Sequence, residues 1–400
     1  MWKSLPPGVR AEAHKSFDAT LRFVAPARRR WHWQRDLAPR PPIAVAGLHR
    51  AVLGIGQGAR LFHSAFRQIG LDAFALDLTG DFALDEVLDD PGPLPPEGGI
   101  LFSHLNPPEL LYWLRRRGMR ALKSRRHIGY WAWETQTPPP SWAEAFAYVD
   151  EIWCPSRFTA QAIARLPGER PPVHIVPHPV FATEGLTPRR PRADGPVNVL
   201  VAFDMRSTAA RKNPWAAIQA FTAADRPEAV LNLKVAAGEA DRAALTRLRA
   251  LASGSNGRIR LIEADLGAAD MAALIVSSDI VMNLHRSEGF GLLIAEAMLA
   301  AKPVITVDWS GPADFLTPQA AALVPFDLVQ AGPEAGPYAG ALWAEADVAE
   351  AGRILGHLID DAPSREALGT AGAHVINGWC GPETWAGRIR EHFDLTQAAD

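Results

Sequence analysis

The stretch DIVMNLHRSEGFGLLIAEAMLAAKPVITVDWS, residues 279–310, joins two apolar runs through a glycine-containing turn and a helix-forming segment. Residues 279–285 and 303–310 are mostly apolar and rich in Val and Ile, as buried strands are. Residues 292–301 contain strong helix formers and no helix breaker. A strand, a helix and a second strand in this order are typical of a parallel sheet with crossover helices.

The same alternation runs through both halves of the chain. We expect strands at residues 43–48, 71–78, 99–105, 127–134, 151–156, 173–178, 197–204, 230–238, 258–265, 279–285 and 303–310. This pattern predicts an α/β protein with two doubly wound Rossmann-like domains that face each other across a cleft.

The domain boundaries follow from changes in composition. Residues 1–40 form a basic and aromatic extension, and residues 41–185 the first Rossmann-like domain. A linker rich in Pro, Gly and Arg at residues 186–196 leads to the second domain, residues 197–375. We expect residues 376–400 to be helical and to pack back on the first domain.

Composition narrows the class of protein. The 400 residues exceed what one hydrophobic core usually supports, and 48% hydrophobic against 21% charged residues indicates a folded chain. No apolar run reaches the roughly 18 residues of a membrane span. Asp18 and Arg22 interrupt the one candidate for a signal-peptide centre. We therefore expect a cytoplasmic protein.

Charge is unevenly distributed along the chain. Residues 1–200 hold 25 Lys and Arg against 19 Asp and Glu, whereas residues 201–400 hold 16 against 25. The basic half is open to two interpretations: a solvated surface, or peripheral contact with the inner face of a membrane. No feature predicts a nucleic-acid partner.

Glu296 is the one charged residue in the segment LLIAEAMLAA, residues 292–301. Apolar residues occur on every face of this expected helix, so the carboxylate is expected to be buried. Because a buried, unpaired carboxylate costs several kcal/mol, Glu296 must have partners. The hydroxyls of a ligand and a hydrogen bond or ion pair within the protein are equally compatible with the sequence.

The turn before this helix has the composition of an anion site. Gly289 and Gly291 allow close approach of the backbone, and the amides at a helix start favour a phosphate. Glu296 follows Gly291 by five residues, or roughly 7.5 Å along a helix axis, about the distance from a phosphate to its ribose. Glu288 is then placed on the other side of the phosphate.

This stretch resembles the paired-glutamate motif of the retaining glycosyltransferases of family 4, which have the GT-B fold. The match runs through Glu288, Gly289, Phe290, Gly291, Leu292, Glu296 and Ala297 and continues into AKPVITVDWSGPADFL. The resemblance implies that Glu288 holds the donor sugar and Glu296 the ribose hydroxyls. It assigns the donor diphosphate to the amides of Gly289, Phe290, Gly291 and Leu292.

A second element, MRSTAARKNPWAAIQAF at residues 205–221, follows an expected strand. Family members have an Arg and a Lys here, which neutralise the diphosphate as it leaves. Lys212 fits this pattern. The Arg is ambiguous between Arg206 and Arg211, and a solvated basic loop is the alternative.

The first domain contributes weaker signals. The stretch GIGQGAR departs from the dinucleotide pattern, but the resemblance implies that Gly54 and Gly56 face the donor phosphate. His104 ends a strand where the family often has a histidine near the donor sugar. Glu134 and Trp131 are candidates for the acceptor site, although Trp131 is equally compatible with core packing.

The resemblance implies transfer of a sugar from a UDP- or GDP-sugar to a hydroxyl of a saccharide or lipid-linked acceptor, with retention of configuration. Polysaccharide or glycolipid assembly is the expected setting, with His104, Glu288 and Lys212 at the reaction centre. No metal or other cofactor is expected, because the chain lacks an Asp-x-Asp element. A nucleotide-sugar epimerase and a non-catalytic sugar or membrane-surface binding module are the alternatives.

Overall fold

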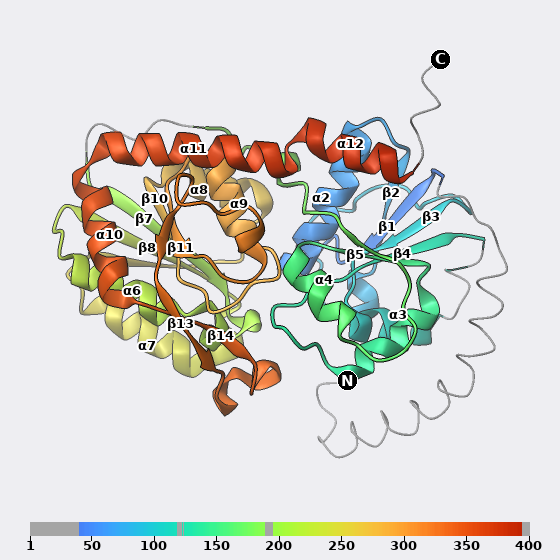
Figure 1. Ribbon diagram of the computed structural model, residues 1–400, viewed down its shortest axis with the longest axis horizontal. Helices are drawn as coiled ribbons and strands as arrows, with labels where there is room; N and C mark the ends of the chain where they lie inside the picture. Colours follow the sequence, from blue (N-terminus) through green and yellow to red (C-terminus); the bar gives the residue numbers. More distant parts are fainter. Residues whose placement is uncertain (1–39, 118–121, 123, 189–194, 394–400) are drawn as a thin grey trace.

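The computed structural model describes residues 40–117, 122, 124–188 and 195–393. The expected N-terminal extension therefore lies outside the described residues, apart from Arg40. Most of the expected linker, residues 189–194, lies outside them too. The described chain forms two α/β halves that lie side by side along the longest axis of the molecule (Figure 1).

The first half contains a six-stranded parallel sheet with strand order β2-β1-β3-β4-β5-β6. In β1, Ile43 lies opposite Ala73 of β2 and Ile100 of β3. All five residues of β1 are buried, as expected for a parallel strand covered on both faces. The elements are β1 (Ile43–Gly47), α2 (Gly54–Gln68), β2 (Ala73–Asp77), β3 (Ile100–Ser103), α3 (Pro107–Arg117), β4 (Arg126–Tyr130), β5 (Glu151–Cys154), α4 (Arg157–Ala164) and β6 (Val173–Ile175).

The second half repeats this architecture with strand order β12-β11-β10-β7-β8-β9, again all parallel. Its helices cover both faces of the sheet (Figure 1). The elements are β7 (Val197–Asp204), α5 (Ala209–Lys212), α6 (Pro214–Ala224), β8 (Ala229–Ala236), α7 (Arg242–Ser253), β9 (Ile259–Glu263), α8 (Ala268–Ser277), β10 (Ile280–Asn283), α9 (Leu292–Leu299), β11 (Val304–Val307) and β12 (Ala322–Val324).

The two six-stranded sheets confirm the predicted fold class of two doubly wound domains. Several predicted strands are longer than the observed ones, and β4 is the clearest example: it stops at Tyr130, and the amide of Ala132 then bonds to the Asn106 side chain at 2.8 Å instead of continuing the ladder. A hairpin in the second half was not predicted. Its strands β13 (Phe326–Gln330) and β14 (Leu342–Ala346) pair antiparallel. No residue of β13 is buried, so this strand lacks the apolar pattern from which a buried strand is predicted.

The C-terminal helices connect the two halves. They are α10 (Val348–Asp360), α11 (Ala362–Cys380) and α12 (Pro382–His392). Helix α11 runs along the second domain toward the first, and α12 lies on the first (Figure 1). The fully buried Trp385 of α12 packs 5.5 Å from the Phe66 ring of α2, and its indole donates to the carbonyl of Pro177 at 3.1 Å. The chain therefore returns to the first domain after completing the second.

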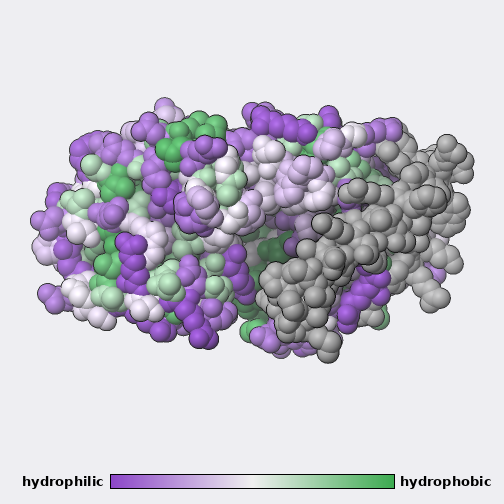
Figure 2. Space-filling model, turned by 90° about the horizontal axis from the view of Figure 1, so that it is seen from below, coloured by the Kyte–Doolittle hydropathy of each residue, from purple (hydrophilic) through white to green (hydrophobic). Residues whose placement is uncertain are grey.

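The described surface is mixed in character. Figure 2 shows one face on which hydrophilic and hydrophobic side chains alternate in small groups over the second domain. The exposed large hydrophobic residues are scattered along the sequence, at Val87, Leu94, Ile175, Leu251, Leu328 and Leu342. Among the described helices, none has the length and apolar character needed to cross a membrane.

Candidate functional site

A group of opposite charges lies where the two domains meet. Arg211 and Lys212 end the short helix α5, and Glu288 lies in the turn between β10 and α9. Arg211 Nη1 donates to Glu288 Oε2 at 3.1 Å and to the Ser287 carbonyl at 2.7 Å. The Lys212 ammonium pairs with the other Glu288 oxygen, Oε1. Helix α5 is oriented by Thr208, whose hydroxyl accepts from the amide of Arg211. Tertiary packing thus joins residues that are 76 and 77 positions apart in the sequence.

The charges in this group stabilise each other. Burial by itself raises the pKa of Glu288, but Lys212 and Arg211 outweigh burial and lower it to about 2. Burial likewise lowers the pKa of Arg211, whereas Glu134 and Glu288 hold it well above its ordinary value. Glu288 and Arg211 are therefore both ionised across the physiological range of pH.

The structure separates the two candidate arginines. Arg211 is almost fully buried against Glu288, with 2% of its side chain exposed. Arg206 instead forms an ion pair with Asp204 at 2.7 Å, and its Nη2 donates to the Val52 carbonyl of the first domain at 2.8 Å. Arg211 is therefore the arginine that shares a site with Lys212 and Glu288.

The glycine-containing turn is closely packed. Gly291 is the N-cap of α9 and has φ at 90°, a left-handed conformation that favours glycine. The carbonyl of Gly289 accepts from Ser156 Oγ at 2.6 Å and from Thr159 Oγ1 at 3.3 Å, both in the first domain. A Cβ at position 289 would lie 3.2 Å from the Trp133 carbonyl. The small residues here allow the backbones of the two domains to approach each other.

Glu296 lies in the middle of α9, and only 7% of it is exposed. Thr183 Oγ1 donates to Glu296 Oε1 at 3.2 Å. Within the described residues, no ion pair links Glu296 to a cation. Burial raises its pKa to about 7, and the hydrogen bond from Thr183 opposes the rise. The carboxylate therefore keeps acceptor capacity that hydroxyl groups of a ligand can use.

His104 directly follows β3 and is 3% exposed. Its ring stacks on that of Tyr130 with centroids 4.7 Å apart and lies 5.4 Å from the His178 ring. Among the described residues, neither ring nitrogen of His104 has a hydrogen-bond partner. Burial, followed by the neighbouring His178, holds the pKa of His104 well below its ordinary value. The imidazole is therefore neutral at physiological pH.

The glycines of the first domain differ in how closely they are packed. Gly54 and Gly56 lie in the first turn of α2. A Cβ on Gly56 would lie 2.5 Å from the Leu48 carbonyl, whereas one on Gly54 would meet nothing within 4 Å. A Cβ on Gly58 would lie 2.3 Å from His104 Nε2. Gly58 is thus the glycine that makes room for the histidine.

The two acceptor-site candidates differ. Glu134 bridges the domains: Arg211 Nη2 lies 3.5 Å from its Oε1, and the Tyr338 hydroxyl donates to its Oε2 at 3.1 Å. Trp131 is fully buried and stacks on Phe146 with centroids 5.9 Å apart. Placing Trp131 in the acceptor site was wrong, because its ring is enclosed by the core and has no face free for a sugar.

Several residues of this site were not predicted. Tyr338 comes from the segment between β13 and β14, Ser156 caps the start of α4, and His178 follows β6. His285 lies at the end of the strand predicted for residues 279–285, and the sequence assigns it no role in the site. It is fully buried, and burial lowers its pKa to about 4. The nearness of His285 to Glu288 in sequence was the one signal available for these four residues.

Comparison with solved structures identifies the fold. Anabaena HepE with UDP-glucose has a TM-score of 0.63 at 15% identity, over 88% of this chain and 99% of HepE. Sucrose-phosphate synthase from Thermosynechococcus elongatus has a TM-score of 0.63 at 14% identity, over 90% and 100%. S. aureus TarM, solved with fondaparinux, α-GlcNAc-glycerol and UDP, has a TM-score of 0.54 at 11% identity. The match covers 74% of this chain and 55% of TarM. The chain thus spans about half the length of TarM. Its two domains define it as a protein of GT-B fold, which confirms the predicted fold.

A family model gives the narrower assignment. The model described as family 4 glycosyltransferase in conflict systems matches residues 156–364, more than half of the chain. The chain belongs to this glycosyltransferase family, as the paired-glutamate motif predicted. No curated protein matched the sequence.

Proposed function

We propose that this glycosyltransferase transfers a sugar from a UDP- or GDP-sugar to a hydroxyl acceptor, with retention of configuration and without a metal ion. One observation carries the proposal: Arg211 and Lys212 converge on Glu288 beside the turn that begins α9. Two buried or half-buried cations next to a helix N-terminus suit a diphosphate. HepE, a protein of the same fold, was solved with UDP-glucose, which supports a nucleotide sugar as the donor.

In this proposal Lys212 and Arg211 stabilise the charge of the departing diphosphate. Electrostatic stabilisation by fixed cations in a site from which water is excluded is often the largest contribution to catalysis. Lys212 has 19% of its side chain exposed, so it can turn from Glu288 to the diphosphate. The amides of Gly289, Phe290, Gly291 and Leu292 complete the phosphate site. Arg206 is assigned to the contact between domains instead.

Glu296 receives the ribose hydroxyls, which replace the missing partners of its carboxylate. Glu288 receives hydroxyls of the donor sugar on the opposite side of the diphosphate. It is held as a carboxylate by Lys212 and Arg211, and these ion pairs make it a poor nucleophile. The departing phosphate then accepts the proton of the attacking hydroxyl on the same face of the sugar, which gives retention.

His104 and Glu134 contribute from the first domain. The neutral His104 ring has nitrogens free to accept or donate a hydrogen bond to the donor sugar. Glu134, with 24% of its side chain exposed, orients the acceptor hydroxyl. The acceptor is a saccharide or a lipid-linked saccharide in polysaccharide or glycolipid assembly. Peripheral membrane contact of the basic half belongs to the same proposal, and co-sedimentation with vesicles containing anionic lipid tests it.

Incubation with labelled nucleotide sugars and no acceptor tests the function. A transferase binds one class of nucleotide and hydrolyses it slowly, whereas an epimerase converts the sugar and a binding module does neither. Glu296→Ala is expected to weaken nucleotide binding at least ten-fold, because two hydroxyls lose their acceptor. The matched control is Glu228→Ala, at an exposed position. Equal affinity of the two variants contradicts the proposed donor site.

A further inference from the structure

A second cluster of side chains lies away from the donor site. Glu151 begins β5, His174 lies in β6, and His392 is the last residue of α12. Glu134 and His104, in contrast, follow the carboxyl ends of β4 and β3. The cluster therefore belongs to the far side of the first domain and has no part in the proposed reaction.

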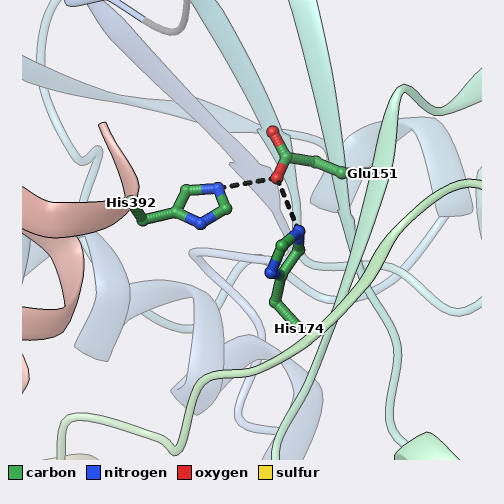
Figure 3. A group of neighbouring side chains, drawn as sticks. All are labelled: Glu151, His174 and His392. Atoms are coloured by element: carbon green, nitrogen blue, oxygen red, sulfur yellow. Dashed lines mark hydrogen bonds and ion pairs between the residues drawn. The ribbon is translucent and has the colours of Figure 1, made fainter. Parts of the chain in front are cut away.

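The three side chains converge on one oxygen atom. Nε2 of His392 lies 2.6 Å from Oε2 of Glu151, and Nε2 of His174 lies 3.5 Å from the same oxygen (Figure 3). One ligand atom from each residue lies within 4.8 Å of the other two. We propose that Glu151, His174 and His392 form a binding site for a divalent transition metal, with Zn²⁺ as the best fit.

The distances suit such an ion. In a tetrahedral zinc site with bonds of about 2.0–2.1 Å, neighbouring ligand atoms are about 3.3 Å apart. The distance from His174 to Glu151, 3.5 Å, is already close to this value, and the His392 ring, at 2.6 Å, needs to move outward by less than about 1 Å. Two imidazoles and a carboxylate are ordinary ligands for zinc.

The surroundings hold the ligands in place. Arg126 Nε donates to the other carboxylate oxygen, Oε1 of Glu151, at 2.8 Å, and the indole of Trp153 donates to Oε2 at 3.3 Å, so both contacts fix the carboxylate with Oε2 facing the imidazoles. The ring of Trp153 meets that of His392 edge-on, with centroids 4.9 Å apart. Outer contacts of this kind orient metal ligands. Glu151 is 1% exposed, whereas the His174 side chain is 38% exposed, so water has access for a fourth ligand.

The site joins parts of the chain that are far apart in sequence. His392 is separated from Glu151 by 241 positions, and α12 reaches it after α11 has crossed from the second domain (Figure 1). A metal ion bound here fastens the C-terminal helix to the sheet of the first domain. Because the ion binds the folded chain and not the separated ligands, it stabilises the fold by mass action.

Titration of the untagged, metal-free full chain with Zn²⁺ against a chromophoric chelator tests the site. We expect one ion per chain in the wild type, and at least ten-fold weaker binding in His174→Gln and in His392→Gln. His374→Gln, at an exposed position on α11, is the matched control and is expected to bind like the wild type. Equal affinity of the wild type and the double variant His174→Gln/His392→Gln overturns the proposal.

Thermal unfolding provides a second measurement that needs no activity assay. A Zn²⁺ concentration that just saturates the wild type is expected to raise the Tm of the wild type and of His374→Gln by the same amount, and that of His174→Gln by clearly less. His174 is the safer variant, because it is half-exposed and its loss leaves the ion pair between Arg126 and Glu151 intact. The same shift in all three proteins means that the cluster is an ion pair and hydrogen-bond contact without a metal, and overturns the proposal.

Discussion

The turn before α9 and the interior of α9 each carry one glutamate, and the two carboxylates behave in opposite ways. Glu288 and Glu296 are both 7% exposed. The pKa of Glu288 is nevertheless lowered to about 2, whereas that of Glu296 is raised to about 7. Burial raises both, but Lys212 and Arg211 face Glu288, whereas among the described residues the Thr183 hydroxyl is the polar group that bonds to Glu296. For these two equally buried carboxylates, the charged partners and not the extent of burial therefore decide the charge.

Removing the charge at Glu288 is expected to have the largest effect on stability. Glu288→Gln leaves the buried Arg211 with Glu134 as its remaining carboxylate, so we expect a loss of about 3–5 kcal/mol in the free energy of unfolding. Urea denaturation at pH 7 measures it. Glu263→Gln, which breaks an exposed pair with Arg249, is the control and is expected to cost less than about 1 kcal/mol. Equal losses in the free energy of unfolding would show that the buried ion pair stabilises the fold no more than the exposed one.

Lys212→Ala tests the same charge group in catalysis. Loss of one group that stabilises the departing diphosphate typically lowers kcat by about 10²- to 10³-fold. Initial rates with the donor found by the labelled-sugar screen measure this effect. Arg249→Ala also breaks an ion pair with a glutamate, but at the surface, and is expected to retain activity within about two-fold. If kcat of Lys212→Ala falls no further than that of Arg249→Ala, Lys212 does not stabilise the departing diphosphate.

Glu288→Gln is expected to lower the free energy of unfolding, whereas Glu296→Gln is expected to raise it at high pH. The folded-state pKa of Glu296, about 7, lies above the ordinary value of 4.5, so folding favours the protonated form. This contribution is complete below about pH 4.5 and is lost as the pH rises to about 7, at about 1.4 kcal/mol per pH unit. Glu296→Gln is therefore expected to be about 3 kcal/mol more stable than the wild type at pH 8, relative to their difference at pH 4.

Urea denaturation of both proteins across this range measures the difference. For Glu288 the sign is opposite: its lowered pKa stabilises the fold above about pH 4.5, and this is lost only as the pH falls toward 2. The gap between wild type and Glu288→Gln is therefore expected to stay constant from pH 5 to pH 8. A constant gap for Glu296→Gln as well would mean that Glu296 is ionised in the free protein like Glu288.

The smallest expected effect concerns the hydroxyl beside Glu296. Thr183→Val keeps the shape of the side chain and removes the hydrogen bond to Oε1, so we expect a loss of about 1 kcal/mol at pH 8, where Glu296 is ionised. At pH 5 the protonated carboxyl depends less on a donor, and the loss should shrink. Thr246→Val, which removes a hydroxyl on the surface of α7, is the control and should show no such dependence on pH.

The sequence was a good guide where function depends on neighbours in the chain. The strand, the turn and α9 follow from residues 279–310, and the burial of Glu296 follows from an apolar helix around it. The sequence did not choose between Arg206 and Arg211. The tertiary structure makes that choice: Thr208, with a positive φ of 63°, caps α5 by accepting from the amide of Arg211, whose side chain meets Glu288.

Trp131 is a second residue whose place the sequence alone did not decide. A tryptophan near the end of a strand is compatible with both a sugar site and a core, and packing against Phe146 decided for the core. Tyr338 is a third such residue, because β13 of the hairpin that carries it has no buried residue and therefore no apolar periodicity to detect. Its contact with Glu134 spans 204 positions.

The sequence by itself determined the two parallel α/β domains, the position of the donor turn and the isolation of Glu296. These features rest on local periodicity and on the spacing of residues along one helix. The tertiary structure alone decided which arginine meets Glu288, why two equally buried glutamates differ in pKa, and that Glu151, His174 and His392 meet. Each of these depends on side chains from distant segments, and their contacts are fixed by how helices and sheets pack and not by any pattern along the chain.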